Sequence, residues 1–212
     1  MRSYPSTVLS DVLDNMNRPQ CILPAEIRSE CSHSMAGRAR TIQISSMISS
    51  EENSGDIYHS LHFIEQLEPG DILVVAVDPP LRNYAFFGGL MAALSERVGL
   101  GGIIIDGKTR DWDSTVDKKS FPIFSRGYYP QDMHYRGVVR QVDCEVIIGS
   151  WPVVRPGDYM FGDADGIVVV PFELSLEVFA RADKVISNEV IIEDLITDGI
   201  PMKQILDERG DF

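Results

Sequence analysis

Two short apolar runs, separated by a helix-like segment, constrain the fold of this chain most. Residues 71–77 read DILVVAV and residues 101–106 read GGIIID, and both runs are rich in β-branched side chains. Continuous runs of this kind are typical of strands that are buried on both faces, as in parallel sheets. The segment between them, LMAALSERVG (90–99), has a helical composition and ends in a glycine. Residues 71–106 therefore predict a strand–loop–helix–strand unit with two parallel strands.

The flanking segments extend this unit into one α/β domain. Residues 6–17, 55–67 and 172–196 carry helical apolar spacing, and residues 38–45 alternate like a strand. After Asp111 the chain reads as short strands separated by Gly, Pro and Asp turns. No linker or low-complexity segment interrupts residues 1–212. We expect a single domain with a mixed sheet, outer helices and a β-rich second half.

Composition excludes several classes of function. The 212 residues include 19 basic and 32 acidic side chains, a formal net charge of −13, and no long basic run, so nucleic-acid binding is not expected. No apolar run approaches the roughly 20 residues of a membrane span, and no signal-peptide pattern opens the sequence. The three cysteines have neither disulfide nor zinc spacing. We expect a cytoplasmic protein with reduced thiols.

A candidate site lies where the two buried strands end. Ligands of α/β sheets bind at the carboxyl ends of parallel strands, beside helix N-termini. The first strand leads to a glycine pair and a helix start, and the second leads to Arg110 and Asp111. If the strands are neighbours, the backbone N–H groups of Gly88, Gly89, Leu90 and Met91 point towards Arg110. Such N–H groups and a guanidinium hold a carboxylate or phosphate, while Asp111 could bind a metal beside it.

Structural interpretations of these residues stay open at this point. Arg110 and Asp111 are also compatible with a surface ion pair at a strand end, and the glycines with a tight turn. His59 and His62 have the i,i+3 spacing of a metal pair, but no acidic partner is in register. GDADG (162–166) resembles part of a calcium loop but lacks the remaining ligands, which favours a β-turn.

Several of these segments together resemble the RraA-like family. The resemblance rests on GGLMAALSERVGLGGIIIDGKTRD (88–111), EPGDILVVAVD, FPIFSRG and VRPGDYMFGDADGIVVVP, and it covers roughly residues 6–200. It implies an α/β single-domain β/β/α sandwich of the swivelling-domain type, with a mixed sheet and a C-terminal helix. It also implies a homotrimer, or a hexamer made of two trimers, with active sites between subunits.

The resemblance implies two alternative functions. One is a divalent-metal-dependent class II pyruvate aldolase, which cleaves a small 4-hydroxy-2-oxo acid to pyruvate and also decarboxylates oxaloacetate. The other is a non-catalytic regulator, which binds and inhibits an RNA-processing endoribonuclease. The aldolases carry Arg-Asp where this chain has Arg110 and Asp111, whereas the enteric regulator has a non-acidic residue after the arginine. The aldolase is therefore our first prediction.

The resemblance also implies roles for individual residues. Asp111 matches the direct metal ligand, with Mg²⁺ favoured over Mn²⁺, and Arg110 matches the residue that binds the pyruvyl group. The backbone of Gly88–Met91 matches the rest of the substrate cradle. Gly89 departs from the family, because the aldolases often have an acidic residue there that holds metal-bound water. Glu189, in preference to Glu193, is the candidate for a glutamate that reaches a neighbouring subunit's site.

Overall fold

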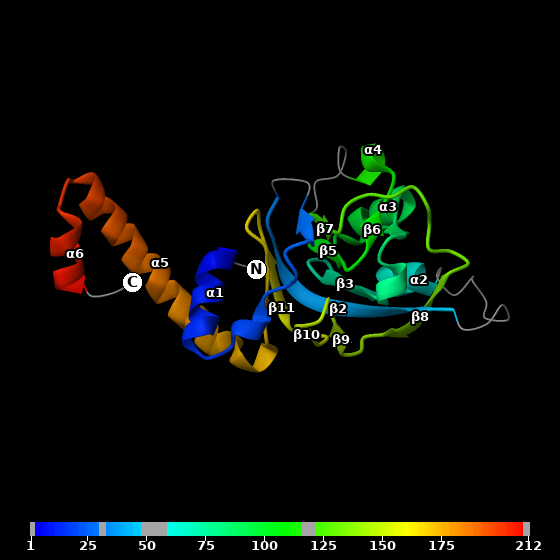
Figure 1. The fold of residues 1–212 in the computed structure, drawn as a ribbon, viewed down its shortest axis with the longest axis horizontal. Coiled ribbons are helices and arrows are strands. Elements are labelled where there is room, and N and C mark those ends of the chain that lie inside the picture. The colour runs from blue at the N-terminus through cyan, green and yellow to red at the C-terminus, as the bar shows by residue number, and fades with distance from the viewer. Residues whose placement is uncertain (1–2, 30–32, 48–58, 116–121, 210–212) are drawn as a thin grey trace.

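The computed structural model describes residues 3–29, 33–47, 59–115 and 122–209. Within them, eight strands form one mixed sheet, in the order β1-β7-β5-β3-β2-β11-β12, with β8 also paired to β2. Figure 1 shows α2, α3 and α4 on one side of the body and α1 and α5 near β11 at the other end. The sheet strands are β1 (Arg28–Ser29), β2 (Met35–Ser46), β3 (Ile72–Val77), β5 (Gly102–Ile105), β7 (Ile123–Ser125), β8 (Gly137–Val142), β11 (Tyr159–Gly162) and β12 (Ile167–Val170).

The parallel centre of the sheet confirms the predicted strand–helix–strand unit. β3 pairs in parallel with β5, and every residue of both strands is buried. The helix between them is α3 (Gly89–Val98), which ends at Gly99 in the left-handed conformation at φ 83°. A left-handed residue after a helix favours glycine because it carries no Cβ. β2 and β7 extend the parallel pairing on either side of this pair.

β2 is longer than the predicted strand 38–45, because it pairs with three other strands along its length. Residues 39–44 pair in parallel with β3, residues 35–38 pair with β11, and residues 42–46 pair with β8. The remaining short strands are β4 (Ala85–Phe87), β6 (Lys108–Thr109), β9 (Val146–Ile147) and β10 (Val153–Val154). β4 lies within the segment 79–87, which the sequence presents only as a loop.

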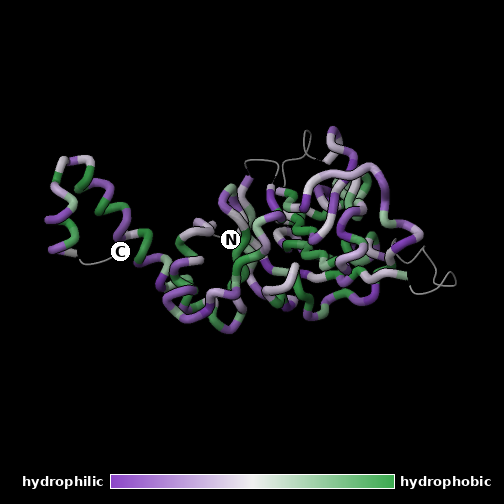
Figure 2. The backbone as a smooth tube through the Cα atoms, in the orientation of Figure 1, coloured by the Kyte–Doolittle hydropathy of each residue, from purple (hydrophilic) through white to green (hydrophobic). Residues whose placement is uncertain are grey.

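Three of the helices outside the central unit match the predicted ranges, whereas a four-residue helix after Asp111 was not predicted and the C-terminal end carries one further helix. The helices outside the central unit are α1 (Ser6–Asn15), α2 (His59–Glu65), α4 (Trp112–Thr115), α5 (Ser175–Thr197) and α6 (Met202–Arg209). Residues 55–58 of the predicted second helix lie outside the described residues. α5 and α6 extend away from the sheet as an arm (Figure 1), on which hydrophobic and hydrophilic residues alternate along the chain (Figure 2). No helix in the described ranges is both long and apolar enough to cross a membrane.

The GDADG segment forms the turn between β11 and β12, as the β-turn interpretation predicts. Its Asp163 accepts hydrogen bonds from the backbone N–H of Ser6, at 2.8 Å, and from the Ser6 hydroxyl, at 2.6 Å. Burial raises the pKa of Asp163, but the hydrogen bonds from Ser6 and from the backbone of Asp165 and Gly166 outweigh it, and the net pKa is lowered. The carboxylate therefore attaches the start of α1 to the sheet.

A fully buried carboxylate orders the edge of the sheet where β5 ends. Asp106 has no exposed surface, and its two oxygens accept hydrogen bonds from Arg126 Nε at 2.6 Å and from the Gly149 N–H at 2.9 Å. Arg82 Nη2 lies 2.8 Å from the second oxygen. A buried charge is tolerated when it is paired and hydrogen-bonded in this way. The cluster ties three loops to the end of β5.

Replacing Asp106 with alanine should therefore destabilise the protein strongly. The variant leaves two partly buried guanidinium groups without their shared carboxylate, and breaking a buried pair costs about 3–5 kcal/mol of unfolding free energy. Urea unfolding measures the loss. Glu145→Ala is the control, because its ion pair with Arg155 is about half exposed and should contribute about 1 kcal/mol or less. An Asp106→Ala loss as small as that of the control would contradict this role.

Candidate active site

A short two-stranded ladder beyond the main sheet brings the two halves of the predicted site together. β4 pairs in parallel with β6, and the Arg110 N–H donates to the Phe87 carbonyl at 2.9 Å. The residues that follow β4 are Gly88 and Gly89, and those that follow β6 are Arg110 and Asp111. The glycine pair and the charged pair are therefore neighbours, as predicted, but through this ladder rather than directly through β3 and β5.

Asp111 turns its carboxylate onto the N-terminus of α3. Its φ is +60°, a left-handed conformation that aspartate adopts more readily than most residues. Its Oδ2 accepts the backbone N–H of Gly89 at 2.9 Å, and Arg110 Nε lies 3.8 Å from the same oxygen. We predicted that the backbone N–H groups of this turn point towards Arg110. In the structure the Gly89 N–H instead donates to Asp111. The helix dipole favours an anion at this position.

Close approach, rather than backbone conformation, explains Gly88. Its φ of −138° is accessible to any residue, but a Cβ there would lie 2.7 Å from Asp111 Oδ2 and 3.2 Å from Arg110 Nε. A Cβ at Gly89 would instead lie 3.0 Å from Cβ of Ser114 and 3.1 Å from its hydroxyl. An acidic side chain at position 89, as in the family's aldolases, would therefore require Ser114 to move.

Two further residues join the site, and the sequence reasoning missed both. Arg110 Nη2 lies 3.0 Å from Asp132 Oδ2, and the other Asp132 oxygen accepts the backbone N–H of His134. The segment is held beside β4 because the Met133 N–H donates to the Ala85 carbonyl at 3.0 Å. Asp132 thus orients the guanidinium of Arg110. The only signal in the sequence was a pair of polar, titratable side chains in an aperiodic stretch.

These residues surround one small cavity of about 170 Å³. It is lined by Ser60, Leu61, Phe86, Gly88, Gly89, Leu90, Met91, Arg110, Asp111, Asp132 and His134. All the predicted substrate-binding residues are in this set, together with the predicted metal ligand. The cavity is therefore the candidate active site.

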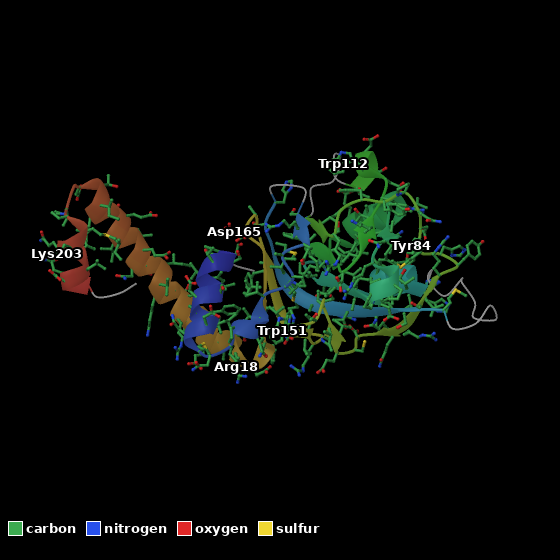
Figure 3. The ribbon with its side chains drawn as sticks, in the orientation of Figure 1. Arg18, Tyr84, Trp112, Trp151, Asp165 and Lys203 are labelled. Atoms are coloured by element: carbon green, nitrogen blue, oxygen red, sulfur yellow. The ribbon has the colours of Figure 1, made fainter. Side chains whose placement is uncertain are left out.

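Glu189 lies elsewhere in the chain. It lines a separate hollow between α1 and α5 with Glu193, Asp11 and Asp14. Figure 3 shows Lys203, at the end of the α5–α6 arm, at the opposite end of the molecule from Trp112, which directly follows Asp111. Within one chain Glu189 does not line the cavity around Arg110, so its reach into a neighbouring subunit stays a prediction.

The donor set at Asp111 suits a cation that keeps most of its water. No cluster of three or more His, Cys, Asp or Glu side chains capable of holding a metal occurs in the described parts of the chain. Mg²⁺ and Mn²⁺ are typically bound through one or two carboxylates and several waters. The Asp111 side chain is 49% exposed, beside the cavity, and meets that requirement. His62 is 77% exposed and lies 3.8 Å from Glu65, which gives no support to a metal pair on α2.

Comparisons with known proteins agree with this architecture. The family model described as "RraA-like: Aldolase/RraA" matches residues 6–169. A protein of Halalkalibacterium halodurans named "Putative 4-hydroxy-4-methyl-2-oxoglutarate aldolase" is 28% identical over 200 residues, which cover 94% of this chain and 88% of that protein. The relatives thus include a proposed aldolase of similar length.

Two solved structures show the same mixed sheet and C-terminal helix. An uncharacterised protein from Pseudomonas syringae pv. tomato DC3000 superposes with a TM-score of 0.82 at 28% identity, covering 95% of this chain and 88% of that one. Streptomyces coelicolor RraAS2, described as an unusual member of the RNase ES inhibitor RraA protein family, gives a TM-score of 0.74 at 25% identity and 89% coverage of both chains. The chain belongs to the RraA-like family.

Proposed function

We propose that this protein is a divalent-metal-dependent pyruvate aldolase. It cleaves a 4-hydroxy-2-oxo acid between C3 and C4 to give pyruvate and a carbonyl product, and it decarboxylates oxaloacetate through the same enolate. The observation that carries the proposal is the presence of Arg110 and Asp111 in one small cavity at the N-terminus of α3. The guanidinium of Arg110 suits an anionic substrate, and the partly exposed carboxylate of Asp111 beside it suits a cation.

Arg110 binds the pyruvyl half of the substrate in this proposal. Its guanidinium is held at 3.0 Å by Asp132, so it is oriented before the substrate arrives. Cleavage of the C3–C4 bond leaves the electron pair on the pyruvyl half as an enolate. A fixed cation beside the developing negative charge stabilises the transition state. Mg²⁺ or Mn²⁺ held by Asp111 would supply the Lewis acidity that such a reaction needs.

Aldol cleavage also needs an acceptor for the C4 hydroxyl proton. Gly89 provides no acidic side chain that could take this part. His134 lines the cavity, and imidazoles act as general bases near neutral pH. Its Nδ1 is buried, so Nε2 is the nitrogen that would accept the C4 hydroxyl proton. Decarboxylation of oxaloacetate needs no such base, since the loss of CO₂ gives the enolate directly.

The assembly that we propose is a homotrimer or a hexamer. The α5–α6 arm exposes several apolar side chains, namely Val190, Ile191, Ile196, Met202 and Leu206. Large apolar residues that gather on one exposed element are typical of interaction surfaces. A neighbouring subunit packed on the arm is also what would bring Glu189 to a cavity.

The alternative function is that of a non-catalytic regulator. Its support is the structural likeness to RraAS2, which is described as belonging to an RNase inhibitor family. In that case the exposed arm would contact an endoribonuclease, and the cavity would have no substrate. Metal-dependent turnover of a 2-oxo acid separates the two functions, because a pure regulator has none.

The removal of the Asp111 carboxylate should abolish turnover. Pyruvate release from oxaloacetate and from 4-hydroxy-2-oxo acids is measured with a lactate dehydrogenase coupling, in Mg²⁺ and in EDTA, and corrected for decarboxylation by the metal alone. We expect EDTA to stop the reaction and Asp111→Ala to lower kcat about 100-fold or more, in the range of other charge-stabilising groups. Asp113→Ala, an exposed aspartate two residues along on α4, is the control.

Two outcomes would contradict parts of this scheme. Normal metal-dependent turnover by Asp111→Ala would remove that residue from the mechanism. The absence of turnover by the unaltered protein with every divalent metal tested would favour the regulator.

Gly88→Ala should impair the chemistry more than the fold. The added Cβ meets only side-chain atoms, the Asp111 carboxylate and the Nε and Cγ of Arg110, so it displaces the site rather than the backbone. We expect kcat/KM to fall about tenfold or more, while urea unfolding changes by about 1–2 kcal/mol. Gly107→Ala is the matched control, since its Cβ meets nothing closer than 3.5 Å. Equal activity of the two variants would show that the close approach at Gly88 is not needed.

A further inference from the structure

The cavity has an apolar side that the proposed chemistry does not use. Four of its lining residues are Leu61 from α2, Phe86 from β4, and Leu90 and Met91 from the first turn of α3. Phe86 is 5% exposed and packs in the hydrophobic core, and Met91 is packed against the same core cluster. The charged groups come from two other segments, residues 110–111 and 132–134. The charged and the apolar lining residues of the cavity thus come from different segments of the chain, and we call them its charged side and its apolar side.

The charged side can balance only one carboxylate of a ligand. Among the lining residues that the structure describes, Arg110 is the one permanent cation, against the two carboxylates of Asp111 and Asp132. Arg110 is already paired with Asp132 at 3.0 Å. A divalent cation at Asp111 would raise the total charge of this set enough to hold one ligand carboxylate. A second carboxylate would have no cation left to pair with among these described lining residues.

A second carboxylate would also meet an unfavourable surface. Transfer of an ionised carboxylate from water to an apolar wall without a partner is strongly unfavourable. An alkyl group against the same wall gains affinity instead, roughly fourfold for each methylene that is fully buried. The charged side and the apolar side of the lining therefore both favour a ligand with one carboxylate and an alkyl group over a ligand with two carboxylates.

We propose that the cavity prefers 2-oxo acids with a single carboxylate and an apolar group beyond C3, so that oxaloacetate, which has a second carboxylate, binds weakly and is decarboxylated with a high KM. For the aldolase reaction, this means 4-hydroxy-2-oxo acids whose C4 substituent is a short alkyl group. Leu61, Phe86, Leu90 and Met91 are the residues that determine this specificity. The cavity volume, about 170 Å³, accommodates a substituent of a few carbons. The identity of the reaction rests on the proposed function, whereas the preference for an apolar ligand is measured without turnover.

The first experiment measures binding rather than catalysis. Isothermal titration calorimetry of the full chain with Mg²⁺, at pH 8, compares 2-oxohexanoate with 2-oxoglutarate. The two ligands are similar in size and share the 2-oxo acid end, but only 2-oxoglutarate has a second carboxylate. Neither has a C4 hydroxyl, so neither is a substrate for aldol cleavage. We expect 2-oxohexanoate to bind at least tenfold more tightly.

A cation introduced at the rim should reverse this preference. Leu90 is 87% exposed, so Leu90→Arg adds a charge to the cavity edge without disturbing the core. The ratio of the two affinities should shift at least tenfold towards 2-oxoglutarate. Leu176→Arg is the matched control, because Leu176 is 86% exposed on α5 and does not line the cavity. That variant should keep the ratio of the unaltered protein.

The proposal is overturned if 2-oxoglutarate binds as tightly as 2-oxohexanoate, if neither binds, or if Leu90→Arg leaves the ratio unchanged. A kinetic comparison separates this failure from that of the aldolase. It measures kcat/KM for 4-hydroxy-2-oxoheptanoate and for 4-hydroxy-4-methyl-2-oxoglutarate. Faster cleavage of the dicarboxylate would keep the aldolase and reject the specificity. An apolar binding preference without any cleavage would keep the specificity and reject the aldolase.

Discussion

The buried carboxylate of Asp106 is the constraint on which the functional edge of the sheet depends. It directly follows β5, and its two arginine partners belong to different loops, one after β3 and one after β7. A buried carboxylate cannot be left without these cations, so the three segments must come together for the chain to fold. The loop after β3 then continues into β4, and β5 continues into β6. The ladder between β4 and β6 is therefore built from segments that this ion cluster ties together.

The ladder between β4 and β6 sets the short distances between Gly88, Arg110 and Asp111. It places Gly88 so close to Asp111 and Arg110 that a Cβ at this position would displace their side chains. In return, the carboxylate of Asp111 reaches the first N–H of α3. Asp132 holds Arg110 from the other side. The charges therefore alternate around the cavity as Asp132, Arg110 and Asp111, and each group is oriented by its neighbour.

The sequence predicted the parts of this arrangement that have a periodic or positional signal. β3, α3 and β5 are long enough for their patterns to be read, and the glycine pair and Arg110–Asp111 follow from where those elements end. β4 and β6 have three and two residues, which is too short for any alternation to appear. Asp132 and His134 reach the site only because their loop pairs with β4, a tertiary contact without a local pattern. The roles given to Glu189 and the metal came from the family resemblance, and one chain contains no second subunit to bring Glu189 to the cavity.

Gly89 connects the charge of the site with its specificity. An acidic residue there would add a third carboxylate to a cavity that is lined by one arginine, and it would require Ser114 to shift. Without that residue, one divalent cation and one ligand carboxylate come close to balancing Arg110, Asp111 and Asp132. A substrate with a second carboxylate would upset this balance in the same way as an acidic side chain at position 89. The departure from the family pattern and the apolar wall of Leu61 and Leu90 therefore favour the same kind of ligand, one with its charge at the pyruvyl end only.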